Sequence, residues 1–423
     1  MQVTGMFRRW MTVMVVALVV GSYASRADAA IEIKSDNGWS ASFSGFLNLF
    51  MVDTFGPAAP AGSGGDLYSR PTDNNWFRIR TGFLPSCFAF NAEAPEWEGL
   101  KFKLRVGIYP QLNNSNTRTS VSPNIDWREF NLTVDGKFGQ LLVGRAINLY
   151  QSEATLGDMS LFGVGIPGAA GAPGATATYG WPTLGHIGFG YLYPAFGAQF
   201  RYTTPDFGGL KLAVAASDPS NIGAPPTSAS PNAPSASITS IPLFEGSLTY
   251  SGKFDSVSLR GWVGGLFNRA WFAPDQQALG RTGAVNGVGG SAGFGLGVSG
   301  FDLLASGFYG SGLGSATQLD GDSLDSTGMP ITTSGFLLQA TYQLDKTKLG
   351  VNYGQNMVDR TDDQKTDTAW NGLKQRQSVT AGVYHDLTKS VKIVAEYSWY
   401  QVSWYGGTSQ AGNVVALGGF FFW

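Results

Sequence analysis

Strict alternation of apolar and polar residues recurs along this chain, and it constrains the fold more than any other feature. In residues 100–109, apolar side chains from Phe102 to Ile108 alternate with the cations Lys101, Lys103 and Arg105. Segments 348–356 and 391–400 repeat the pattern. A period of two places the two kinds of side chain on opposite faces of a β-strand. The sequence therefore predicts an all-β fold whose strands each have two different faces.

Short turns and long polar loops alternate between these segments. Tight turns such as 135–137, 252–253 and 345–347 are followed by long stretches rich in Gly, Pro, Ser, Asn and Asp, such as 146–186 and 219–242. Short turns at one end and long loops at the other are typical of membrane-spanning barrels. We expect sixteen antiparallel strands, at 39–54, 75–91, 100–111, 124–135, 137–146, 187–204, 209–218, 243–251, 255–268, 287–299, 301–312, 332–344, 348–356, 376–386, 390–404 and 413–423.

The first residues have the three parts of a secretory signal peptide. Arg8 and Arg9 precede a short apolar run, and small residues lead to Ala27-Asp28-Ala29, an A-x-A cleavage site. The apolar run is too short to cross a bilayer as a helix, which takes about 20 residues. We expect a signal peptide over 1–29 and a barrel over 30–423. An uncleaved N-terminal anchor is the alternative.

The C-terminal segment indicates how the sheet closes. Residues 413–423 alternate like a strand and end in Phe420-Phe421-Phe422-Trp423. Such a strand would be an exposed, aggregation-prone edge in a soluble protein. After residue 30 every apolar run is interrupted within a few positions, and a chain without a spanning helix can cross a membrane only as a closed barrel. We therefore expect 413–423 to pair with the first strand, around 43–52.

Composition excludes several classes of function. The chain is 14% charged and has 58 Gly, whereas soluble domains have about a quarter charged residues. A formal net charge of −2 gives no overall attraction to nucleic acid. Cys87 is the only cysteine, so no intrachain disulfide can form. No Cys/His cluster has metal-ligand spacing, and we expect no cofactor.

At three places the chain resembles the Gram-negative general diffusion porins. The last strand ends in an aromatic residue. The hairpin 384–390 leads into the strand 391–397, and the segment from Arg128 through Phe138-Gly139 to Gly144-Arg145 resembles the strand pair before that family's constriction loop. The acidic Pro-Glu-Phe-Gly-Gly signature of some members is missing after Arg145, which leaves open where in the loop the constriction lies.

The resemblance implies a sixteen-stranded antiparallel transmembrane β-barrel with short periplasmic turns, long extracellular loops and a third loop, 146–186, folded into the lumen. It also implies an outer-membrane homotrimer in contact with lipid and lipopolysaccharide. The function that it implies is passive diffusion of small hydrophilic solutes and ions through a water-filled pore.

Inward-facing charges are the candidate selectivity residues, because rings of charge in a narrow passage decide which ions pass. We expect a basic wall on the second and third strands to face carboxylates of the third loop, giving a weak preference for small anions or zwitterions. Arg145 could instead take part in subunit contacts, and Arg128 is assigned to the outward face by parity with Phe130 and is left out. The candidate pore-lining residues are Arg78, Arg80, Lys103, Arg105, Arg145, Glu153, Asp158 and Arg260.

Three other functions are weaker interpretations. An enzyme would need a base beside a nucleophile, and neither of the two histidines, His186 and His385, has an evident Ser and acid partner. A substrate-specific channel would show an aromatic track, for which Trp262 and Phe308 alone are too few. A structural or adhesive barrel would not conduct. The loop carboxylates Asp362, Asp363 and Asp367 are better explained by solvation than by calcium binding.

Overall fold

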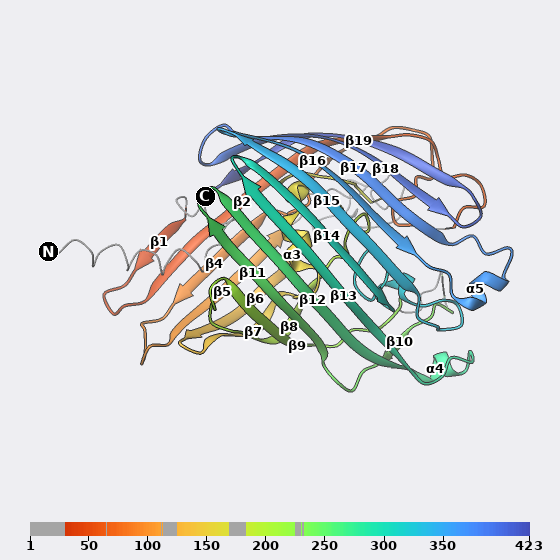
Figure 1. Cartoon of the computed structure of the whole chain (residues 1–423), viewed down its shortest axis with the longest axis horizontal. Coiled ribbons are helices and arrows are strands. Elements are labelled where there is room, and N and C mark those ends of the chain that lie inside the picture. Colours follow the sequence, from red (N-terminus) through yellow and green to blue (C-terminus); the bar gives the residue numbers. More distant parts are fainter. Residues whose placement is uncertain are drawn as a thin grey trace.

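A closed antiparallel sheet makes up most of the protein, as the computed structural model shows (Figure 1). The structure describes residues 30–64, 66–110, 112, 125–168, 183–224, 230 and 232–423, so the expected signal peptide lies outside the described residues. Within them, nineteen strands form one sheet: β1 (Ile31–Lys34), β2 (Ser40–Phe55), β3 (Trp76–Arg80), β4 (Cys87–Glu93), β5 (Lys101–Pro110), β6 (Ile125–Gly136), β7 (Gly139–Ile147), β8 (Phe196–Thr203), β9 (Leu210–Ser217), β10 (Ala236–Ile238), β11 (Leu243–Phe254), β12 (Val257–Phe272), β13 (Ala284–Val298), β14 (Phe301–Ser311), β15 (Thr332–Leu344), β16 (Thr347–Val358), β17 (Leu373–Asp386), β18 (Val391–Trp404) and β19 (Ser409–Phe422).

These strands make a barrel with sixteen wall positions. The sheet closes because β19 pairs with β2 and β9 pairs with β11. β3 and β4 both pair with β2, so they are two halves of one wall strand. β1 and β10 are short additions that pair with β2 and β12. The predicted sixteen-stranded antiparallel barrel is confirmed.

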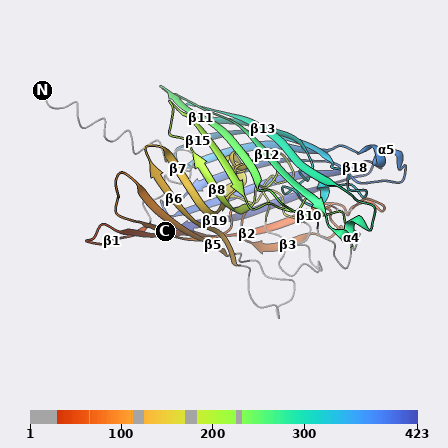
Figure 2. The ribbon, with the colours of Figure 1, turned by 90° about the horizontal axis from the view of Figure 1, so that it is seen from below.

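The two ends of the barrel differ. Turns of two residues join β11 to β12, β13 to β14 and β15 to β16. The opposite end carries long loops, two of which contain the short helices α4 (Pro274–Gln277) and α5 (Asp362–Thr366). Both helices lie at the end opposite β1 and the C-terminus in both views (Figures 1 and 2). No helix in the described part of the chain is both long enough and apolar enough to cross a membrane.

The outer wall is apolar because alternate side chains of every strand face outward. Leu349 and Val351 on β16 and Ile393 on β18 are exposed, whereas Asn352 and Lys392, one residue away, are buried on the inner side. This pattern suits a barrel surrounded by lipid.

Trp423 completes the seam as expected. Its backbone N–H donates to the Gly45 carbonyl at 3.1 Å, and the Gly45 N–H donates to the Trp423 carbonyl at 3.0 Å. A Cβ on Gly45 would lie 2.7 Å from the Trp423 ring, so the indole packs where only glycine fits. Trp423 also contacts the rings of Phe43 and Phe88.

Two predicted strands differ from the structure, one by an interruption and one in where it begins. The strand predicted at 75–91 is interrupted at residues 81–86, where Pro85 cannot donate to a ladder and Asn48 takes the place of the missing partners. Asn48 accepts from the Gly82 N–H at 2.6 Å and donates to the Leu84 carbonyl at 2.8 Å. The strand predicted at 187–204 begins only at Phe196, because residues 187–192 are buried inside the barrel as part of the preceding loop.

Candidate functional site

The loop between β7 and β8, here called the constriction loop (residues 148–195, described at 148–168 and 183–195), enters the lumen. Its entry is held by Glu245 on β11, whose carboxylate accepts the backbone N–H groups of Leu149 at 3.0 Å and Tyr150 at 3.2 Å. Two short helical segments follow, α3 (Ser152–Gly157) and η2 (Met159–Phe162). The Met159 N–H donates to Gln339 on β15 at 2.7 Å, so the loop reaches the far wall.

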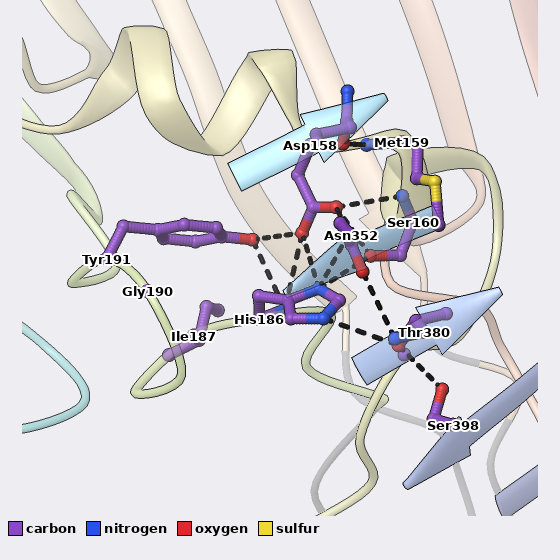
Figure 3. A network of polar contacts seen from close by, with 12 residues as sticks. Asp158, Met159, Ser160, His186, Ile187, Gly190, Tyr191, Asn352, Thr380 and Ser398 are labelled. Atoms are coloured by element: carbon purple, nitrogen blue, oxygen red, sulfur yellow. Dashed lines mark hydrogen bonds and ion pairs between the residues drawn. The ribbon is translucent and has the colours of Figure 1, made fainter. Parts of the chain in front are cut away.

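Asp158, between α3 and η2, is the centre of a buried polar network (Figure 3). Its carboxylate accepts from the Ser160 N–H at 2.9 Å, from the Tyr191 hydroxyl at 2.7 Å and from the Asn352 amide at 3.1 Å. Ser160 and Tyr191 belong to the outgoing and returning limbs of the loop, and Asn352 belongs to the wall strand β16. Asp158 therefore joins both limbs to the barrel wall.

The imidazole of His186 completes this network. Its Nδ1 lies 3.2 Å from the Asp158 Oδ2, and its Nε2 lies 3.3 Å from the Thr380 hydroxyl on β17. Burial acts to raise the pKa of Asp158, but the imidazole and the hydrogen bonds from Ser160 and Tyr191 outweigh it and lower the pKa to about 2. Asp158 is thus ionised at any pH above about 4.

A second carboxylate, Glu396 on β18, holds the tip of the loop. It accepts the backbone N–H groups of Val164 at 2.7 Å and Gly165 at 2.9 Å, and the Tyr384 hydroxyl donates to it at 2.6 Å. A Cβ on Gly163 would lie 1.9 Å from the Glu396 Oε1, so the carboxylate fits only because residue 163 is glycine. The constriction loop is therefore anchored at its entry and at its tip by two wall glutamates, neither of which the sequence pattern predicted.

The mouth of the barrel has its own anchor in Arg376 on β17. Its guanidinium donates twice to Asp66 in the loop after β2, at 2.8 and 2.6 Å, and once to the Ser315 carbonyl in the loop after β14, at 3.0 Å. Tyr68, beside Asp66, donates to the Ile187 carbonyl of the constriction loop. Three loops distant in sequence are thus joined around one buried cation.

The Asp158–His186 contact does not make a hydrolytic triad. Ser160 Oγ and Asp158 Oδ2 both approach the same nitrogen, His186 Nδ1, at 3.1 and 3.2 Å, whereas a triad needs the hydroxyl and the acid on opposite nitrogens. The hydroxyl on the opposite nitrogen is that of Thr380, which is fully buried and also contacts the Ser398 hydroxyl at 2.8 Å, so it is closed to a substrate. The side chains of His186 and Asp158 have no solvent exposure. The expectation that His186 lacks Ser and acid partners was wrong, but their geometry is that of a structural latch.

Most of the predicted pore-lining cations face the lumen, and acids on the next strand accompany several of them. Arg78 and Arg80 are on the inner side of β3, because Phe77 and Ile79 are exposed outside. Lys103 lies 3.2 Å from Asp135, and Arg105 donates to Glu129 at 2.9 Å. Arg260 pairs with Asp302 on β14.

The predicted basic wall is therefore partly neutralised and is not continuous. Asp135 and Glu129 on β6 supply counter-charge that the alternation pattern did not predict. The interruption at 81–86 separates Arg80 from the stretch of β4 that pairs with β5, where Asn91 lies opposite Arg105.

The two loop acids have different surroundings. Burial raises the pKa of Glu153 on α3, and the charges of Arg260 and Arg201 oppose that rise. Glu153 thus lies near cations of β12 and β8, as an eyelet would require. Asp158 faces no wall cation among its contacts and instead holds the loop in place.

Two assignments of direction were wrong. Arg145 is exposed on the outward face of β7, beside Leu141 and Val143, so it does not line the lumen. Arg128 lies inside: it donates to Asp126 at 2.8 Å and its guanidinium lies 5.4 Å from the Tyr109 ring centre. An irregularity in the β5–β6 register, where Gly107 faces Glu129 but Ile108 faces Trp127, reverses the parity at Arg128.

A closed sixteen-stranded barrel with an apolar outer wall, a charged inner wall and a loop folded inside defines an outer-membrane channel. The family model of the Gram-negative porins matches residues 13–403, and the chain belongs to that family. It is accordingly a protein of the outer membrane. No curated protein sequence matches the chain.

Solved structures agree on the fold. The outer membrane channel DcaP of Acinetobacter baumannii is 18% identical, with a TM-score of 0.65 over 92% of this chain and 99% of that one. The anion-selective porin from Comamonas acidovorans is 13% identical, with a TM-score of 0.59 over 91% and 100%. OprB of Pseudomonas putida is 13% identical, with a TM-score of 0.53 over 96% and 97%.

Proposed function

We propose that the barrel is a water-filled channel for passive diffusion of small hydrophilic solutes and ions, with a weak preference for anions. The observation that carries this proposal is the uneven exposure of the inner wall. The side chains of Lys103, Arg105 and Arg260 are 43%, 37% and 43% exposed although all three point inward. The constriction loop covers one wall of the barrel, whereas these inward charges on the other wall remain solvated. Their solvation indicates an aqueous path on the uncovered side.

The pairing of charges supports weak selectivity. Ion pairs such as Arg105–Glu129 and Lys103–Asp135 leave little net field, so neither sign of ion is strongly excluded. Arg201 on β8 donates to the neutral groups of Gln199 and Ile147 and makes no ion pair within the described residues, although the charges of Glu245 and Glu153 act on it. A guanidinium without a paired carboxylate favours anions in its vicinity. The anion-selective porin among the structural neighbours is a precedent for that sign, but its name describes that protein alone.

Planar-bilayer recordings test the proposal. We expect discrete conductance steps and a small reversal potential of anion-selective sign in a KCl gradient. Arg105→Ala leaves Glu129 without its cationic partner and should move selectivity toward cations. A clear cation preference that Arg105→Ala leaves unchanged would contradict the selectivity proposed here. Liposome swelling with sugars of graded size would give the exclusion limit.

The alternatives differ in what the same recordings show. A substrate-specific channel would conduct KCl in steps that its own solute blocks at low concentration, and a structural or adhesive barrel would give no steps. We further propose, from the family, that the chain assembles as a homotrimer in contact with lipopolysaccharide after cleavage of residues 1–29. Mass spectrometry of the purified outer-membrane protein would determine its first residue and its subunit number.

A further inference from the structure

Several inward cations near the short-turn end of the barrel have a carboxylate partner on a neighbouring strand or in the adjoining turn. Lys392 on β18 lies 2.9 Å from Asp386 on β17, Lys211 on β9 lies 3.7 Å from Asp206, and Arg260 pairs with Asp302. Lysine and arginine side chains that face a confined lumen are normally compensated in this way, because an uncompensated charge loses hydration without gaining a partner.

Lys348 on β16 departs from this rule. Its neighbour Leu349 is exposed on the outer wall, so Lys348 points inward, and it lies opposite Tyr384 in the β16–β17 ladder. Its Nζ lies 5.3 Å from the centre of the Tyr384 ring. Within the described residues the ammonium group makes no ion pair or hydrogen bond with the protein. Its three donors are therefore uncommitted within the described part of the protein.

The surroundings of Lys348 favour an anion. The charges that act on it are those of Lys392, Asp302, Asp386 and Arg260. Both acids already have cationic partners, Lys392 for Asp386 and Arg260 for Asp302, so Lys348 is the one of these cations without a paired carboxylate. Lys392 also lies 5.8 Å from the ring centre of Phe162, at the end of η2, which places the group beside the tip of the constriction loop.

We propose that Lys348, with Lys392 and Arg260, forms a binding site for small oxyanions on the periplasmic side of the constriction loop. The ligand class is a carboxylate or a phosphate, because an oxygen of either accepts a charge-assisted hydrogen bond from an ammonium group. The ring of Tyr384 lies beside the Lys348 ammonium group, while the Tyr384 hydroxyl is committed to Glu396. The site gives the anion preference of the proposed channel a location, and in that respect it rests on the proposed function.

The test compares Lys348→Gln with Lys348→Arg and with Lys346→Gln. Lys346 is an exposed residue of the β15–β16 turn, two positions away, so its substitution makes the same change of charge outside the lumen. Titration calorimetry with inorganic phosphate, and separately with acetate, measures binding to the detergent-solubilised protein. Planar-bilayer recordings measure the reduction of chloride conductance by the same anions.

We expect phosphate, and more weakly acetate, to bind the wild-type protein and to reduce its chloride conductance. Lys348→Gln should weaken binding about tenfold, equivalent to about 1.4 kcal/mol, while Lys348→Arg and Lys346→Gln retain it. Equal binding by wild type and Lys348→Gln, or no binding by either, would overturn the site. Binding that depends on Lys348 in a protein without conductance steps would support the site and refute the diffusion function, so the two failures are distinguishable.

Discussion

The imidazole of His186 contacts the carboxylate of Asp158 across 3.2 Å, and the two side chains belong to opposite limbs of the constriction loop. The outgoing limb carries Asp158 and the returning limb carries His186. Asn352 and Thr380, on adjacent wall strands, contact the same pair. The pair thus closes the loop on itself and fastens it to the barrel, so the width of the channel depends on residues that do not line it.

Asp158→Asn should loosen the constriction loop at neutral pH. The amide keeps the shape of the carboxylate but loses its charge-assisted hydrogen bonds, which costs on the order of 2–3 kcal/mol. We expect larger open-channel current noise and a broader distribution of conductance, measured in planar bilayers. Asp362→Asn makes the same chemical change on a side chain that is 98% exposed and should leave the noise unaltered. Equal current noise in the two variants would contradict the role of Asp158 in holding the constriction loop.

Acid should weaken the same contacts of Asp158, because it protonates the carboxylate. Asp158 has a pKa of about 2 in the folded loop against an ordinary value of 3.8, so its ionised form stabilises the folded loop at any pH above about 4. That stabilisation, about 2 kcal/mol, is lost as the pH falls from about 4 through 2. We expect current noise to rise over this interval in wild type and to rise less in Asp158→Asn. A rise confined to pH 7–5 would exclude Asp158 as its cause.

Gly163→Ala should displace the tip of the loop. The new methyl group would meet the Glu396 carboxylate at 1.9 Å, and this carboxylate cannot move without leaving the Val164 and Gly165 N–H groups unpaired. Each unpaired buried donor costs about 1–3 kcal/mol. Electrical recordings should show a changed mean conductance, and Glu396→Ala should change it likewise. Gly265→Ala controls for the added methyl group, because a Cβ there would lie no closer than 3.6 Å to its nearest neighbour, the Gly289 carbonyl.

The barrel was predictable because its constraints are local and repeated. Alternation in segments such as 348–356 specifies which face of each strand meets lipid, and the aromatic end at Trp423 specifies a strand that must be paired. Both predictions hold in the β15–β16 and β19–β2 ladders. The strand at 75–91 was predicted as continuous because the alternation of residue types does not show that the Asn48 side chain can take over the hydrogen bonds of a neighbouring strand.

The site was less predictable because it depends on contacts between distant residues. Parity placed Arg128 outside, and one register irregularity in β5–β6 places it inside. Arg105 was identified as a lumen cation, but its partner Glu129 becomes visible only when the strand register is known. Glu245 and Glu396 carry no local signature, since their function is to accept N–H groups from a loop at least 95 residues away.

Arg376→Lys tests whether the mouth loops depend on one guanidinium. Lysine keeps the charge but cannot donate twice to Asp66 and also reach the Ser315 carbonyl, because only a guanidinium has donors in that fork. Since Arg376 and Asp66 are 2% and 1% exposed, water cannot replace the lost bonds, and we expect a loss of about 1–3 kcal/mol. The loops after β2 and β14 should then be cleaved faster by protease added to the outside of intact cells.

Arg360→Lys is the matched control, because Arg360 lies over the Tyr405 ring at 4.6 Å, where lysine can still make a cation–π contact. Unchanged cleavage in Arg376→Lys would show that the mouth loops are held by their other contacts, such as that of Tyr68 with Ile187.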